Sequence, residues 1–527
     1  MHEVITLQLG QQSNYLATHF WNAQESYFTY SEDEQSPVNH DIHWRPGLGV
    51  DGTETFMPRT VIYDLKGGFG SLKKINALYE ASDEGQAQGI WNGPTVVHRQ
   101  QPIGQSAYLQ SLDAGSEPPE LTTDTVRYWS DFNRIFFHPK SIIQLNEFEL
   151  NSTIQPFEKW TTGQDLFSSL DKEHDLVDRD VRPFAEEADM MQGIQVFASF
   201  DDAWGGFASE YLERLRDEYG KTDIWVWGLQ DSFAGVPRDK RLQRLTNKAK
   251  TMTEMYKYAS LVVPVTLPSP LGSNISLDAS SNWHTSALLA SAIETVTLPS
   301  RLRTGFHNDT YSGIASLLNQ TGKQSIAGLQ MSVPREGALS NLIDARQRQD
   351  AQDADTVMED ASDDEASTSL RLDLDFTPTD QLDFHSRQQN GSHQPRIFSQ
   401  IQTIRSSSAE HQQRKMLDPE EEAERLRRRN PNKPLTRQYH SSLAFPLLDS
   451  FPRIFRDENG NKLGGRADIT ASLTTDASVS ARLKLLRTTV LRSIGVEDRE
   501  VLGSELADMA DEYHEGWDSG SDEGDDD

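Results

Sequence analysis

Cysteine is absent from this 527-residue sequence. Its absence excludes disulfide bridges, thiolate metal sites and cysteine nucleophiles, although it does not identify a cellular compartment. The histidines also lack the spacing of metal ligands. His40 and His43 share only a loop, where we expect structural or solvent-exposed roles. The sequence therefore predicts no metal site.

Long apolar runs are missing as well. The most apolar stretch, residues 260–271, is short and broken by three prolines, whereas a membrane-spanning helix needs roughly 20 apolar residues. The chain starts Met1-His2-Glu3 and runs directly into an apolar strand, without a basic or Arg-rich leader. We therefore expect no transmembrane segment and no cleavable address. The default location is the cytosol or the cytosolic face of an organelle.

Positive charge is scarce. The chain has 50 basic against 81 acidic residues, for a formal net charge of −31, and no long basic patch. Such a chain repels nucleic acid, so we expect no direct nucleic-acid partner. Apolar residues make up 36% of the sequence, below the usual share for compact domains. Part of the chain is therefore expected to remain unpacked.

Short apolar, β-branched runs alternate with helical periodicity over roughly the first half of the chain. The predicted strands cover residues 4–9, 60–65, 141–145, 194–200, 224–229 and 261–265, with helices between them, including one with Leu72, Ile75 and Leu78 and one over 126–135. This alternation predicts a mostly parallel sheet covered on both faces. Ligands of such sheets bind at the carboxyl ends of the strands, where glycines fall here.

Composition divides the rest of the chain. Residues 335–433 are polar and acidic, which predicts a mostly disordered insertion. Within it, residues 418–429 have the charge order of a helix, and their arginines suggest either a solvated helix face or a nuclear-import signal. Residues 1–300 form the predicted α/β domain, and residues 301–334 with 434–500 form a second α+β or helical domain. Residues 501–527 form a predicted acidic tail, which we expect to be extended and solvated from residue 507 onward.

The first predicted strand ends at a glycine that leads into a helix. The turn reads Gly10-Gln11-Gln12-Ser13-Asn14. A helix N-terminus offers free N–H groups and the positive end of the helix dipole, so this turn is a candidate phosphate site. Alone the signal is weak, because glycine is common in strand-to-helix turns.

Three motifs in the same order and at comparable spacing resemble those of tubulins. The start of the chain, through Asn14 to Phe20-Trp21, resembles the tubulin N-terminus with its first phosphate loop. Residues 58–65 and the glycines beyond resemble the strand and loop that reach the magnesium and terminal phosphate. Residues 192–195, Gln-Gly-Ile-Gln, resemble the strand that leads into the tubulin glycine signature. The resemblance covers about residues 1–300.

Further segments resemble the Misato branch of the tubulin/FtsZ superfamily. They are residues 131–141, 163–167, 283–287 and the acidic ending 519–522. The resemblance implies an α/β fold of the tubulin/FtsZ type, with a parallel, Rossmann-like, GTPase-type domain followed by a smaller α+β domain. It also implies a role in mitochondrial distribution, inheritance of mitochondrial DNA and cell division.

The resemblance also implies a degenerate nucleotide site. Its candidate residues are Gly10, Gln11, Gln12, Asn14, Asp64, Gly67, Gly68, Gly205 and Gly206. Aligned from residue 192, however, the tubulin glycine loop falls on residues 201–207, where Asp201, Asp202 and Trp204 replace small residues. Two carboxylates beside a phosphate repel it by on the order of several kcal/mol at an effective dielectric near 20. We therefore expect no catalytic residue, and we expect GTP, the implied cofactor, to bind poorly or not at all.

Two other positions depart from tubulin. Lys66 stands where many tubulins have an acidic residue, and lysine cannot coordinate magnesium although it can contact phosphate. Residues 66–71 therefore form either a phosphate cradle or, since they lack P-loop spacing, a plain glycine turn. No acidic residue near 282–301 clearly has the hydrolytic role, and Glu294 is expected to be a solvated carboxylate.

Three hypotheses remain open, because one fold hosts many functions. The first is a non-catalytic, tubulin-like adaptor in mitochondrial organisation and inheritance, located at the mitochondrial surface and in the cytoplasm. The second is an active, self-assembling GTPase. The third is a cytosolic assembly factor for tubulin in cell division. The expected partners are proteins: tubulin, chaperonin or mitochondrial-surface proteins.

Overall fold

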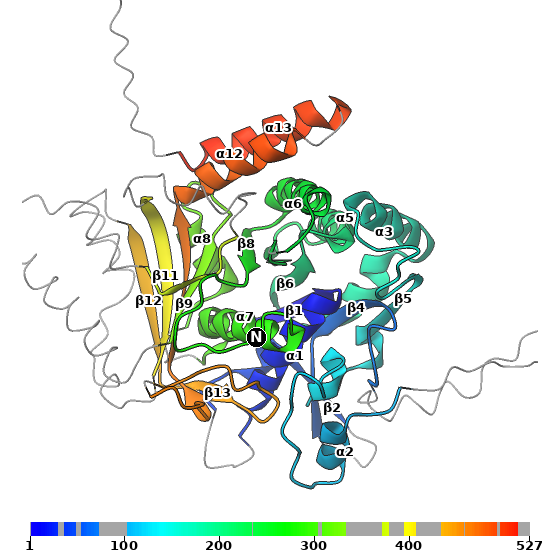
Figure 1. Ribbon diagram of the computed structural model, residues 1–527, viewed down its shortest axis with the longest axis vertical. Helices are drawn as coiled ribbons and strands as arrows, with labels where there is room; N and C mark the ends of the chain where they lie inside the picture. The colour runs from blue at the N-terminus through cyan, green and yellow to red at the C-terminus, as the bar shows by residue number, and fades with distance from the viewer. Residues whose placement is uncertain are drawn as a thin grey trace, which may run out of the picture.

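The computed structural model describes most of the chain (Figure 1). The described residues are 2–29, 36–48, 54–72, 103–233, 235–303, 308–333, 371–378, 395–406, 434–457, 459–492 and 496–514. The predicted helices at 72–78 and 418–429 fall largely or wholly outside these ranges.

A six-stranded parallel sheet forms the centre of the N-terminal part, in the order β5-β4-β1-β6-β7-β8. Its strands are β1 (Glu3–Leu9), β4 (Thr60–Lys66), β5 (Ile142–Glu149), β6 (Met191–Ser199), β7 (Asp223–Gln230) and β8 (Leu261–Thr266). All seven residues of β1 are buried, as expected of a strand covered on both faces. The predicted α/β class with a parallel sheet is confirmed.

Helices cover both faces of this sheet and define two hydrophobic cores. On one face lie α1 (Gln11–Glu25) and α7 (Asn282–Thr297); on the other lie α3 (Trp160–His174), α5 (Ala203–Glu218) and α6 (Arg238–Tyr258). Side chains of β1 alternate between the two cores, with Val4 in one and Ile5 and Leu7 in the other. The alternation follows from the two-residue period of a strand.

A second, mixed sheet of five strands, in the order β10-β9-β15-β11-β12, packs against the other side of α7. Its strands are β9 (Gly328–Ser332), β10 (Leu374–Asp375), β11 (Ile397–Arg405), β12 (Leu435–Ser441) and β15 (Ile469–Asp476), and α8 (Tyr311–Leu318) contacts β11. Figure 1 shows this sheet standing beside α7. Strands β10 and β11 lie within the range 335–433 that was predicted to be a mostly disordered insertion, and the rest of that range lies largely outside the described residues. Gln400 and Thr403 of β11 are polar but buried, because β11 lies inside the sheet and pairs with β15. Composition alone does not reveal that burial.

Two C-terminal helices, α12 (Ser478–Val490) and α13 (Val496–Asp511), pair with each other and lie across α6 (Figure 1). The apolar face of α13, including Leu506 and Met509, is buried, and so is Tyr513 just after the helix. The prediction that the tail is extended from residue 507 is therefore wrong for the helical residues up to Asp511, and the turn that follows them is also packed. Its acidic residues interrupt an apolar helical repeat that buries one face of α13, and the segment 515–527 lies outside the described residues.

Smaller elements complete the described part. They are β2 (Trp44–Leu48), β3 (Glu54–Pro58), β13 (Phe445–Leu447), β14 (Gly465–Ala467), α2 (Ala107–Asp113) and α4 (Arg182–Ala185), with 3₁₀ turns at His40–Ile42, Trp129–Phe132, Pro139–Ser141 and Leu298–Arg301 and a π-turn at Val177–Val181. The helix predicted over 126–135 is only the turn Trp129–Phe132, because these large side chains point into the core from irregular backbone.

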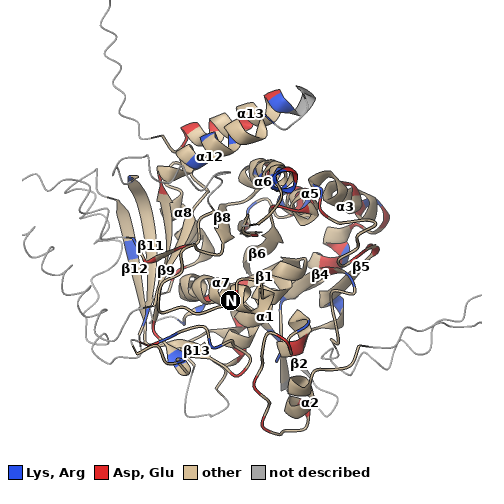
Figure 2. Cartoon of the chain, viewed as in Figure 1, with Lys and Arg blue, Asp and Glu red and all other residues tan. Residues whose placement is uncertain are grey.

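Within the described ranges, no helix combines the length and apolarity that crossing a membrane requires. Figure 2 shows acidic and basic residues distributed over many of these elements.

Candidate functional site: the carboxyl edge of the parallel sheet

The turn from β1 into α1 lies at the carboxyl edge of the sheet, as predicted. Gly10 has φ of +86°, a value that side-chain-bearing residues rarely adopt, and its N–H donates to the Tyr63 carbonyl at 3.0 Å. Helix α1 follows without a side-chain cap. Its first N–H groups therefore have the geometry of a potential anion site.

The Trp204 indole lies against this turn. A Cβ built on Gly10 would come within 2.6 Å of the indole Cε2, and Trp204 is only 5% exposed. The ring also packs edge-on against Phe157 and Phe207, with centroid distances of 5.2 and 5.6 Å. The packed indole therefore occupies the side of Gly10 on which a side chain would lie.

Acidic side chains surround the same edge. Asp202 caps α5 by accepting a hydrogen bond from the Trp204 N–H at 2.8 Å. Asp201, 4% exposed, lies at the end of β6 and accepts from Ser199 Oγ at 3.1 Å. Asp231, just after β7, accepts from Gln12 Nε2. Arg244 on α6 is the neighbouring cation, 3.8 Å from Asp201 and 3.4 Å from Asp231.

This crowding changes the titration of the carboxyls. Burial, and then the charge of Asp201, raises the pKa of Asp202 from 3.8 to about 8. Burial and the charge of Asp231 raise the pKa of Asp201 to about 6, although Arg244 works in the opposite direction. The folded protein therefore disfavours additional negative charge at this edge.

Asn14 and Asp64, predicted to contact one ligand, are hydrogen-bonded to each other. Asp64 accepts from Asn14 Nδ2 at 2.9 Å, from the Leu65 N–H at 2.9 Å and from Trp129 Nε1 at 3.3 Å. Burial raises its pKa to about 6 despite these bonds. Because its oxygens already have protein donors, the carboxylate serves as an internal acceptor that ties α1 to β4.

The loop after β4 divides into a tight and an open part. A Cβ on Gly68 would lie 2.6 Å from Asp64 Oδ2, whereas Gly67, with φ of +88°, has open space beside it. Lys66 is exposed. Position 68 requires glycine because a Cβ there would overlap the Asp64 carboxyl group. Position 67 favours glycine because the turn has a positive φ.

Gly205 and Gly206 lie inside α5, where it crosses two other helices. A Cβ on Gly206 would overlap the Trp160 carbonyl group of α3, and one on Gly163 of α3 would overlap the Ala203 carbonyl group. A Cβ on Gly205 would overlap Thr251 of α6. Close helix packing accounts for these glycines, since small residues let helix backbones approach.

Glu294 is not solvated, contrary to the expectation from sequence. It is fully buried and forms ion pairs with Arg301, which follows α7, and with Arg405 of β11. Tyr27 Oη also donates to it at 3.1 Å. Burial alone would raise the pKa of Glu294, but the two guanidinium groups outweigh it and lower the pKa. The cluster joins the first domain to the second sheet.

Sequence reasoning missed three participants at the sheet edge: Trp129, Asp231 and Arg244. Each is distant in sequence from the residues it contacts, and none belongs to a short motif, so no local pattern could have identified them. Among the described residues, no group of three or more His, Asp or Glu side chains is arranged to hold a metal ion.

Comparisons with known proteins agree with this architecture. A tubulin domain model matches residues 118–302, and a model described as the Misato Segment II tubulin-like domain matches residues 2–114. A parallel sheet with a glycine turn at its carboxyl edge, joined through a central helix to a second sheet, thus defines a tubulin-like protein.

Full-length relatives narrow the assignment. Protein dml-1 of Neurospora crassa is 61% identical over 541 residues, and Protein DML1 of Gibberella zeae is 48% identical over 536, each covering 100% of both chains. A more distant relative, Protein DML1 of Yarrowia lipolytica, is 27% identical over 543 residues, again with 100% coverage of both chains. The chain belongs to the Misato/DML1 family of tubulin-like proteins.

Proposed function

We propose that this protein is a non-catalytic, tubulin-like adaptor that acts in mitochondrial organisation and in the partitioning and inheritance of mitochondrial DNA. The observation that carries the non-catalytic part is the contact between Trp204 and Gly10. The tubulin resemblance assigns a phosphate to the first turn, and here a buried indole lies directly against the glycine of that turn.

Electrostatics supports the same conclusion. Asp201, Asp202 and Asp231 converge on the carboxyl edge, with Arg244 as the cation placed among them. A triphosphate would add several negative charges to an edge where burial and neighbouring carboxyls already raise the pKa of Asp201 and Asp202, so the site disfavours each added charge. Phosphoryl transfer depends on neutralising such charge, so this edge is poorly suited to it.

The mitochondrial part of the proposal comes from the family resemblance. We place the protein at the cytosolic face of the mitochondrion and in the cytoplasm, where its folded body binds protein partners. Mitochondrial-surface proteins, tubulin and chaperonin are the candidate classes. If the protein were an assembly factor for tubulin, affinity purification would recover chaperonin subunits with it instead of mitochondrial-surface proteins. Affinity purification therefore separates these two roles.

An active GTPase is the second candidate, and one observation favours it. Asn14 and Asp64, two of the residues the resemblance assigns to the nucleotide, lie side by side at the ends of α1 and β4. Asn14 Oδ1 accepts no hydrogen bond from the described residues, so it would be available to a ligand if the side chains around it moved.

The deciding experiment is to denature freshly purified protein and identify any released nucleotide, with tubulin processed in parallel as a positive control. We expect tubulin to release guanine nucleotide and this protein to release none. GTP titration with magnesium by calorimetry should likewise show no saturable heat. Stoichiometric guanine nucleotide, or hydrolysis that accelerates with protein concentration, would contradict the non-catalytic proposal. Normal mitochondrial segregation in a deletion strain would contradict the mitochondrial part.

A further inference from the structure

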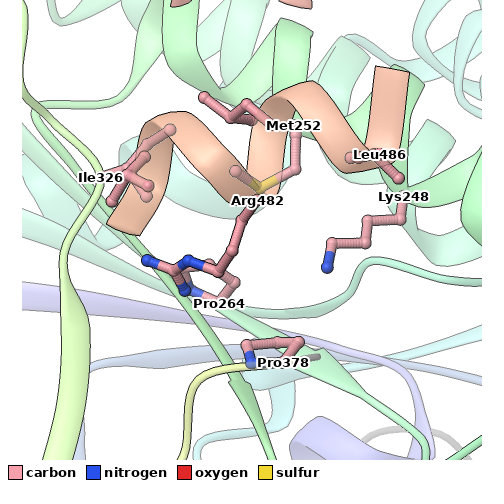
Figure 3. Close-up of a pocket in the computed structure, with 9 residues that line it drawn as sticks. Lys248, Met252, Pro264, Ile326, Pro378, Arg482 and Leu486 are labelled. Carbon is pink, nitrogen blue, oxygen red and sulfur yellow. The ribbon is translucent and has the colours of Figure 1, made fainter. Parts of the chain in front are cut away.

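Helix α12 has a buried inner face and an exposed outer face. On the inner face, Leu483 and Leu486 line a small pocket together with Met252 of α6 (Figure 3). Helix α12 packs against α6 and α13, and its outer face is exposed at Ala481, Lys484, Leu485, Arg487 and Thr488. The outer face is therefore open to an occupant.

The charge of α12 and of the turn after it is entirely positive. Residues 477–496 contain no Asp or Glu but four cations, Arg482, Lys484, Arg487 and Arg492. None of the four forms an ion pair with a residue that the structure describes. A group of unpaired cations on an exposed helix attracts an anionic partner. This local charge is opposite to that of the whole chain, which is −31.

Carboxylates at the end of α13 pair with lysines outside α12. Glu505 forms an ion pair with Lys257 of α6 at 2.9 Å. Glu512, just after α13, forms one with Lys323 at 2.7 Å. These two ion pairs join α13 to the body of the protein and leave the cations of α12 available to another anion.

The described chain ends beside the start of α12. Helix α13 runs back along α12, and Arg487 Nε donates a hydrogen bond to the Gly503 carbonyl at 2.7 Å where the two helices meet (Figure 1). Beyond α13, Tyr513 Oη accepts a hydrogen bond from the Ile326 N–H at 2.6 Å. This bond fixes the point from which the chain continues after His514, the last described residue.

The segment that follows is acidic and long enough to cover α12. Residues 515–527 read EGWDSGSDEGDDD, with seven carboxylate side chains and no Lys or Arg. Fully extended, they span about 43 Å, whereas the 13 residues of α12 rise about 20 Å. Covalent attachment also gives the segment an effective concentration on the order of millimolar, which compensates for the weakness of individual exposed ion pairs.

We propose that the C-terminal segment, residues 515–527, runs back along the outer face of α12 in the same chain, with its carboxylates beside Lys484, Arg487 and Arg492. The bound segment covers this face, so an acidic partner reaches α12 only after displacing it. A basic partner that captures the segment uncovers the same face. The contact depends neither on nucleotide binding nor on where the protein acts.

The absence of cysteine permits a direct test in the full chain. Ser504→Cys at an exposed position of α13 and Ser521→Cys in the C-terminal segment give a unique pair of nitroxide labels for electron–electron distance measurement. At low salt we expect one narrow distance distribution in the otherwise unchanged chain. Because exposed ion pairs are screened by salt, about 1 M salt should broaden the distribution severalfold.

Charge reversal tests the two partners separately. Lys484→Glu together with Arg492→Glu should broaden the distribution severalfold at low salt. Reversing the tail in that variant should narrow the distribution again, because the attraction is restored with its signs exchanged. The tail reversal consists of Asp522→Lys, Glu523→Lys, Asp525→Lys, Asp526→Lys and Asp527→Lys.

Lys172→Glu together with Lys221→Glu is the matched control, because it makes the same charge change at two exposed lysines outside α12. It should leave the distribution narrow, and its thermal unfolding should match that of the α12 reversal, which verifies that the fold is intact. The proposal is overturned by a broad distribution in the unchanged chain at low salt, by a narrow one that survives the α12 reversal, or by equal broadening in the control. Failure of the tail reversal to restore a narrow distribution also overturns it. So does a narrow distribution that appears only at high protein concentration, which would place the segment on a second copy.

Discussion

The Trp204 indole packs directly on Gly10, so that a single added Cβ at Gly10 would lie 2.6 Å from the indole Cε2. This contact places a buried aromatic ring beside the turn that leads into α1. It also makes Gly10 a packing residue as well as a turn residue, and the two roles can be separated by mutation.

Gly10→Ala should lower the free energy of unfolding by about 2–4 kcal/mol, because strain at φ of +86° adds to an overpacked contact with Trp204. Gly115→Ala is the matched control, since Gly115 also has positive φ, +65°, but has nothing within 4 Å of its added Cβ. It should cost only about 1 kcal/mol. Urea unfolding measures both, and equal losses would show that the indole contact is not energetically important.

Gly206→Ala should destabilise the protein by about 3 kcal/mol or more, because the new methyl group would overlap the Trp160 carbonyl group and force α3 and α5 apart. Gly220→Ala serves as the control, since its added Cβ would meet the Arg216 carbonyl at an ordinary 3.6 Å. The control should change stability by less than about 1 kcal/mol. A Gly206→Ala protein as stable as the control would refute the packing role of this glycine.

Glu294→Gln should cost about 3–5 kcal/mol of stability, because it leaves Arg301 and Arg405 buried without their carboxylate. The comparison is Glu254→Gln, which weakens a partly exposed ion pair with Lys257 at 2.9 Å and should cost under about 1 kcal/mol. Hydrogen exchange should also show faster opening of β11 in Glu294→Gln. Unchanged protection of β11 would mean that the cluster does not hold the second sheet in place.

Asp202 should make the protein less stable as the pH rises. Its pKa is raised from 3.8 to about 8, so the folded state retains a proton that the unfolded chain has lost. The resulting stabilisation is complete below about pH 4 and is lost as the pH rises towards 8.

Asp202→Asn removes the charge but keeps a side-chain acceptor for the Trp204 N–H. Relative to the parent, its free energy of unfolding should therefore rise between pH 5 and pH 8 by on the order of several kcal/mol, because each pH unit between the two pKa values is worth about 1.4 kcal/mol. Asp124→Asn, at an exposed position, is the control and should be neutral at both values. Chemical unfolding at the two pH values is the measurement. A variant less stable than the parent at pH 8 would contradict the proposed titration.

Local sequence was informative wherever one element's own pattern decided the outcome. The strands near 4–9, 60–65 and 224–229 were predicted from continuous apolar runs, and all are found within a residue or two of the observed bounds. The turn at Gly10 was predicted from a glycine between a strand and a helix. Asn14 and Asp64 were placed at one site by the family resemblance, and the structure brings them into contact.

Predictions failed where burial is decided by distant segments. Glu294 has a helical neighbourhood that suits a solvated carboxylate, but it is buried in ion pairs with Arg301 and with Arg405, and Arg405 belongs to a segment predicted to be mostly disordered. Strand β11 itself has a polar composition, but pairing with β15 and β12 satisfies its backbone. The acidic composition of the C-terminal residues likewise led to the prediction of a tail where α13 buries an apolar face.

The sequence by itself determined the succession of strands and helices, the parallel sheet and the membership of a tubulin-like family, because periodicity and motif order are properties of neighbouring residues. Only the tertiary structure decided that Trp204 packs on Gly10, that two arginines enclose Glu294, and that α12 and α13 lie across α6. Those contacts join residues far apart in the chain, and their energies depend on burial and mutual distance, which exist only once the layers have packed.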